Sequence, residues 1–109
     1  MKFGFVKVAA AIPTVKVADC KFNAQQAETQ IAIADGKGVQ IVVFPELNLT
    51  GYSCGDLFGQ QLLLEQAELA LMQIMNNTRQ LDVISIVGMP VIVNSTLLNC
   101  AVVFQKERF

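Results

Sequence analysis

The sequence predicts an α/β fold with its elements in the order β-α-β-α-β-β. Runs of β-branched and aromatic residues are typical of buried strands, and two segments between them carry apolar residues at helical spacing. The composition, with 53% hydrophobic and 16% charged residues, also argues against disorder. Strands that alternate with helices in this way are typical of right-handed βαβ units, so we expect a sheet with parallel strands.

The first strand and the first helix are predicted in the N-terminal third of the chain. Residues 3–11 form a short, apolar strand. Asn23 and Gln26 have the spacing of a capping box, so we expect the helix to begin near Asn23. Gly36 and Gly38 end this helix. Its apolar face is built mainly from small residues, which allow close packing on a sheet: Ala24, Ala27, Ile31 and Ala34.

The second strand and the second helix follow a similar pattern. Residues 41–44 are a continuous β-branched and aromatic run, which predicts a central parallel strand buried on both faces. Pro45 ends this strand, and a loop rich in Gly, Ser, Thr and Asn covers residues 45–59. A helix is expected from about residue 60 to residue 79. Its predicted inner face consists of Leu63, Ala67, Ala70, Leu71, Ile74 and Met75.

The last predicted elements are strands. Residues 83–89 form a third strand, and residues 91–93 and 97–104 form a hairpin or two successive strands around a turn at residues 94–95. The chain ends shortly after this strong strand, where a sheet would keep an open apolar edge. We therefore expect residues 1–109 to be a partial domain, truncated at its C-terminal side.

The charge pattern excludes several classes of function. The net charge is −1, from 8 basic and 9 acidic residues, and no basic stripe indicates nucleic-acid binding. No run approaches the ~20 apolar residues that span a membrane. The low fraction of charged residues predicts that part of the surface is covered by missing chain or by partner subunits. We therefore expect a homo-oligomer.

The cysteines and the absence of histidine narrow the chemistry further. The 3 cysteines are widely spaced, and with no histidine the chain has neither the usual zinc ligand spacing nor a Ser-His-Asp triad, so no metal site is expected. An odd number of cysteines without a secretion signal fits the reducing cytoplasm.

Glu46 is the residue best suited to catalysis. It follows the second predicted strand, and ligands of open α/β sheets bind at the carboxyl ends of strands. Pro45 restricts the backbone on either side of it, so the carboxylate leaves the sheet in a defined direction. Apolar neighbours there can raise a carboxyl pKa into the range of a general base. The alternative is a solvated loop glutamate or one that caps a backbone turn.

The sequence around Glu46 resembles a known family. The Phe-Pro-Glu triplet after a β-branched run resembles the carbon–nitrogen hydrolase (nitrilase) superfamily, and residues 44–58 are more narrowly similar to the glutaminase domain of bacterial glutamine-dependent NAD synthetases. Four further segments support this resemblance in the same chain order: residues 13–15, Asn23, residues 87–90 and residues 98–103.

The resemblance implies the N-terminal portion of an α-β-β-α sandwich and a Glu-Lys-Cys triad. Glu46 would be its general base, acting on a cysteine that attacks the glutamine amide, while the family's lysine and cysteine fall beyond Phe109. Tyr52 would contact the substrate, glutamine. The amidase domain would need no cofactor, and the ammonia would pass to a C-terminal synthetase domain that uses ATP and Mg²⁺. This chain alone is then expected to be inactive.

Other residues and other functions have weaker support. Cys54 has no nearby cation to lower its pKa, and Lys106 lies at the end of a strand, where lysines are usually solvated. Asp56 is more readily a helix cap than a site residue. A fragment of a stand-alone amidase of the superfamily and a non-catalytic oligomerisation or binding module remain as alternatives.

Overall fold

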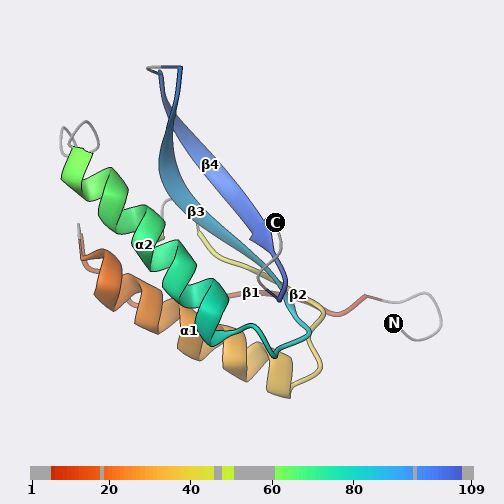
Figure 1. The fold of residues 1–109 in the computed structure, drawn as a ribbon. Coiled ribbons are helices and arrows are strands. Elements are labelled where there is room, and N and C mark those ends of the chain that lie inside the picture. The colour runs from red at the N-terminus through yellow and green to blue at the C-terminus, as the bar shows by residue number, and fades with distance from the viewer. Residues whose placement is uncertain (1–5, 18, 46–47, 51–60, 95, 107–109) are drawn as a thin grey trace.

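A computed structural model describes residues 6–17, 19–45, 48–50, 61–94 and 96–106. It contains a four-stranded sheet in the order β1-β2-β3-β4, in which β1, β2 and β3 are parallel and β4 is antiparallel to β3. Helices α1 and α2 lie side by side against this sheet (Figure 1). The predicted α/β order is therefore confirmed. The elements are β1 (Val8–Ala10), α1 (Cys20–Gly36), β2 (Ile41–Val43), α2 (Gln61–Asn77), β3 (Ile84–Val93) and β4 (Thr96–Phe104).

One face of the sheet is buried under the two helices. The strand register places Ala9, Val42, Ser85 and Phe104 in one row across the four strands, and three of these residues are buried while Ala9 packs against the core. All four residues of the predicted apolar face of α1 are buried, and so are the six predicted residues of α2. The helical spacing in the sequence thus identified the core-facing sides of both helices.

The opposite face of the sheet is apolar and open. The adjacent row consists of Ala10, Val43, Ile86 and Val103, and in this row Val43 is 36% and Val103 46% exposed. The prediction that β2 is buried on both faces is therefore wrong for the described chain. β2 is central and parallel, as its composition indicated, but in the part of the chain that the structure describes helices cover it on one side only.

The start of α1 and the length of β1 also differ from the prediction. The helix begins at Cys20, and the Asp19 carboxylate caps it by accepting a hydrogen bond from Phe22 N at 3.0 Å. Asn23 is therefore not the cap, because its amide is buried and bonded elsewhere. β1 is only 3 residues long, although Ala11 N still donates to the Val43 carbonyl. At the other end of α1 the predicted stop is confirmed, with Gly38 at φ +74°.

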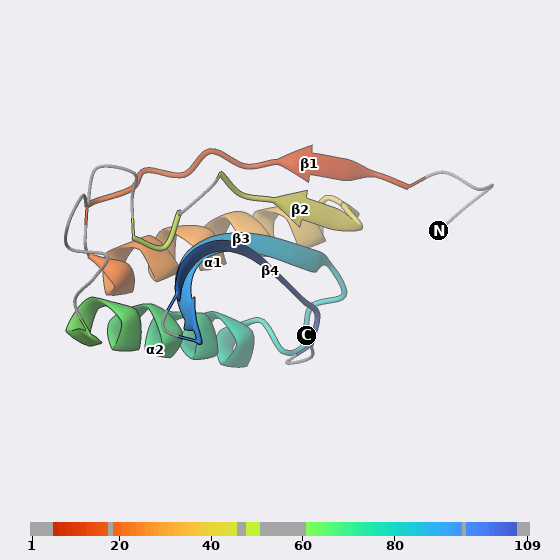
Figure 2. The same cartoon turned by 90° about the horizontal axis from the view of Figure 1, so that it is seen from above.

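β3 is one continuous strand that passes through Pro90, and it does not break after residue 89. Gly88 turns its N–H and its carbonyl towards residues 48 and 49, so Pro90, two residues later, faces the same edge and its missing N–H costs no bond to β4. Asn94 has a φ of 50° in the predicted turn, and β4 follows as the second strand of a hairpin. Figure 2 shows β1 at one edge of the sheet and the curved hairpin at the other.

Candidate functional site

The first half of β3 holds the chain that follows β2 on both sides of residue 46. Phe44 N donates to the Ile86 carbonyl at 2.9 Å, and Leu49 N donates to the Gly88 carbonyl at 3.2 Å. Phe44 and Leu49 are themselves buried. The segment that follows β2 is therefore attached to β3 at two points, two residues apart along β3.

Asn48 makes the second attachment stronger. Its Oδ1 accepts a hydrogen bond from Gly88 N at 2.8 Å, and its side chain is only 1% exposed. Its Nδ2 is buried and has no acceptor among the residues that the structure describes. Buried polar groups are normally paired, so within the described residues this donor is an exception.

Asn23 connects the same segment to the start of α1. Its Oδ1 accepts from Lys16 N at 2.8 Å, and its Nδ2 donates to the carbonyls of Lys16 at 2.8 Å and Leu49 at 2.9 Å. The amide is 1% exposed, so these bonds are shielded from water. Sequence reasoning missed this role. The signal was an asparagine beside the apolar stripe of the helix, four residues before Ala27.

A cavity of about 300 Å³ opens at the carboxyl end of β2. It is lined by the end of β2, by β3 and by β4, with Pro45, Gly88 and Cys100 among its residues. This volume is at the lower end of the range for small-ligand sites. The free thiol of Cys100 is partly buried at this cavity, whereas Cys20 belongs to the core under the helices.

The predicted site residues Glu46 and Tyr52 lie outside the described residues, as do Cys54 and Asp56. Their roles stay predictions. The structure does place the residue before Glu46, Pro45, at the cavity, and it places Asn48 against β3. Within the described part of the chain, no group of three His, Cys, Asp or Glu side chains could hold a metal ion. Neither α1 nor α2 has the length and apolar character needed to cross a membrane.

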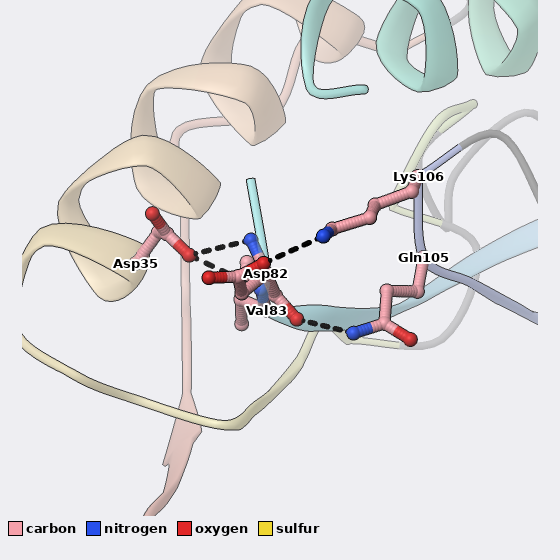
Figure 3. Close-up of polar contacts among 5 residues, drawn as sticks. All are labelled: Asp35, Asp82, Val83, Gln105 and Lys106. Atoms are coloured by element: carbon pink, nitrogen blue, oxygen red, sulfur yellow. Dashed lines mark hydrogen bonds and ion pairs between the residues drawn. The ribbon is translucent and has the colours of Figure 1, made fainter. Parts of the chain in front are cut away.

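A second polar cluster lies at the other end of the sheet, where β3 begins (Figure 3). The Asp35 carboxylate, from the last turn of α1, accepts hydrogen bonds from Asp82 N at 2.9 Å and Val83 N at 3.1 Å. Lys106 pairs with Asp82 at 2.8 Å, with the two side chains 50% and 84% exposed. The hydrogen bond from Lys106 and its positive charge lower the pKa of Asp82. Lys106 is thus in a solvated ion pair with Asp82, just before the start of β3.

Comparison with known proteins identifies the family. The family model described as carbon-nitrogen hydrolase matches residues 7–109. The chain belongs to the carbon–nitrogen hydrolase family. The predicted resemblance to that family is therefore confirmed over nearly the whole sequence.

Individual curated proteins are also similar to this chain in sequence. A glutamine-dependent NAD(+) synthetase of Mycobacterium leprae is 33% identical over 103 residues, which make up 94% of this chain and 15% of the relative. A synthetase of the same name from Aquifex aeolicus is 48% identical over 50 residues, 46% of this chain and 9% of the relative. The chain thus spans 15% or less of the length of these curated relatives.

Two solved structures share the fold. A glutamine-dependent NAD(+) synthetase from Cytophaga hutchinsonii superposes with a TM-score of 0.84 at 25% identity, over 93% of this chain and 17% of the other. An amidase from Nesterenkonia sp. gives a TM-score of 0.68 at 22% identity, over 79% of this chain and 32% of the other, which shows the fold alone. The synthetase is more similar by both measures, so the alternative of a stand-alone amidase is not favoured.

Proposed function

We propose that this chain is the N-terminal part of a glutaminase domain, in a protein that hydrolyses glutamine and uses the ammonia to make NAD. The observation that carries the proposal is the 33% identity to a glutamine-dependent NAD(+) synthetase over 94% of the chain. The attachment of Phe44, Asn48 and Leu49 to β3 next to a cavity supports it, since ligands of α/β sheets bind at the carboxyl ends of strands.

Glu46 is the proposed general base of the glutamine reaction. It follows Pro45 at the cavity, and it takes the proton of a cysteine that the family resemblance assigns to the chain beyond Phe109. That cysteine attacks the amide carbon and ammonia leaves, after which water releases glutamate. A lysine, likewise beyond Phe109, stabilises the oxyanion. Tyr52 is proposed to contact the glutamine substrate.

The remaining components belong to the rest of the proposed protein. We place ATP and Mg²⁺ in its C-terminal synthetase domain, as the family resemblance implies. The glutaminase reaction itself is proposed to need no cofactor. Residues 1–109 would form only part of the glutaminase domain, and these residues alone would be inactive. We also propose that the full-length protein is a homo-oligomer and that it lies in the cytoplasm.

The decisive experiment uses the Glu46→Gln variant of the full-length protein with two nitrogen sources. Gln is nearly isosteric with Glu but cannot accept the proton, so glutamine-dependent NAD synthesis is expected to fall roughly 10²–10⁴-fold. Synthesis from ammonium salts is expected to continue, because that route needs only the synthetase domain. Equal loss with both nitrogen sources would assign Glu46 a structural role. Unchanged synthesis from glutamine would remove it from the mechanism.

A further inference from the structure

We propose that Asn48 and Asn23 are positioning residues for the glutamine reaction and that they hold the chain around Glu46 in its reactive place. The proposal rests on the function proposed above. It starts from the position of Asn48, two residues after Glu46, and from the carbonyl of Leu49, which Asn23 binds at 2.9 Å.

The geometry gives Asn48 a fixed orientation. Gly88 N–H can only donate, so the amide oxygen of Asn48 must face it, at 2.8 Å. Leu49 N donates back to the Gly88 carbonyl at 3.2 Å. Residues 48 and 49 therefore satisfy both backbone groups of Gly88, in the way that a paired strand would. A shift of this segment by two residues along β3 would bring it to Pro90, which has no N–H, or to Ile86, whose carbonyl already accepts from Phe44 N.

Asn23 prevents movement in a second direction. Its amide joins the Leu49 carbonyl to the backbone of Lys16, which follows β1. The segment after β2 is thus bonded to β3 on one side and, through Asn23, to the start of α1 and the segment after β1 on the other. Both amides are 1% exposed, so water does not compete for these bonds.

Asn48 both adds to and subtracts from the stability of the fold. Its Nδ2 is buried without an acceptor among the described residues, whereas a leucine of similar shape would bury no such donor. Replacing Asn48 by Leu removes this unpaired donor but leaves Gly88 N–H unpaired. The two effects oppose each other, so the variant is expected to fold.

The test compares Asn48→Leu with Asp35→Ala in the full-length protein. Asp35→Ala is a matched control, since it also removes side-chain bonds to backbone N–H groups at β3, but at the other end of the sheet. For Asn48→Leu we expect the kcat of glutamine hydrolysis to fall roughly 10- to 100-fold, because misplacement of a reacting group by ~1 Å has an effect of this size. The KM for glutamine is expected to stay within about threefold, since binding contacts are retained.

Two further results are expected if Asn48 and Asn23 position the reaction. Ammonium-dependent synthesis by Asn48→Leu stays at the wild-type level, and Asp35→Ala keeps the wild-type kcat. An unchanged kcat in Asn48→Leu would overturn the proposal, and so would an equal loss of kcat in Asp35→Ala. If the proposed function itself is wrong, wild-type protein shows no glutamine hydrolysis or Glu46→Gln is fully active, which separates the two failures.

Asn23→Ala covers the case in which Asn48→Leu does not fold, because it releases the Leu49 carbonyl on the other side of the segment. Where this variant supports ammonium-dependent synthesis, the proposal expects its glutaminase kcat to fall while its KM for glutamine changes little. An unchanged kcat in such a protein would contradict the proposal.

Discussion

The first and last turns of α1 both bind backbone groups of neighbouring segments, but they do so by different chemistry. Asn23 is a neutral amide, 1% exposed, that bonds two loops at the carboxyl end of β2. Asp35 is a carboxylate that accepts two N–H groups beside the exposed Asp82–Lys106 pair, at the amino end of β3. A buried neutral group keeps its hydrogen bonds without the large cost of burying a charge, whereas a charge is tolerated where water reaches it. The two ends therefore predict different responses to mutation.

Asn23→Ala is expected to give the largest loss of stability of the three changes that compare these ends. It leaves the buried Leu49 carbonyl without its donor, and an unsatisfied buried group together with lost packing costs about 2–4 kcal/mol. The midpoint of urea unfolding of the full-length protein measures this. A loss no greater than that of Asp35→Ala would show that burial does not distinguish the two ends.

Asp35→Ala is expected to cost less, about 1 kcal/mol, because water can bind the N–H of the exposed Asp82 when the carboxylate is gone. The same urea series measures it. Asp35→Asn is the control, since an amide oxygen can still accept these bonds, and it should recover most of the loss. A loss equal to that of Asn23→Ala would mean that the amino end of β3 is as well shielded from water as the carboxyl end of β2.

Lys106→Met is expected to have the smallest effect, because exposed ion pairs contribute little. The pKa of Asp82 is lowered in the folded protein by Lys106, so the pair stabilises the fold above the ordinary value of 3.8 and loses this contribution as the pH falls through the lower folded value. A small difference between wild type and variant at pH 7 should therefore vanish in acid and shrink with added salt. A difference that grows in acid would contradict the sign of this shift.

The sequence predicted the order of the elements and the buried sides of both helices, because apolar spacing is a local property that tertiary packing then uses. It placed the start of α1 wrongly because the capping-box pattern of Asn23 and Gln26 is also local, whereas Asn23 is bonded to Leu49, 26 residues away. Pro90 suggested a break in β3 for a similar reason. The strand can continue because the nitrogen of Pro90 points away from β4. This direction follows from the bonds of Gly88 to residues 48 and 49, which only the three-dimensional structure shows.

For the candidate site, the sequence supplied Glu46 through its place after a strand and through the family resemblance, and it supplied Tyr52 through the resemblance. Both remain predictions because they lie outside the described residues. The residues that hold the neighbouring chain, Asn23 and Asn48, became visible only in three dimensions. Neither residue type specifies a partner by itself, since an asparagine side chain can bond to many backbone groups.

Pro90 also has a consequence for unwanted association. Beyond Gly88, the edge of β3 that faces residues 48 and 49 offers no N–H at position 90, so an incoming strand from another molecule could not form a regular ladder there. The exposed apolar side chains of the hairpin, Val93 and Leu98, lie beyond Pro90, near its turn, whereas Pro90 itself is buried. Pro90 therefore removes one N–H from the ladder that a further strand would need on this edge of β3.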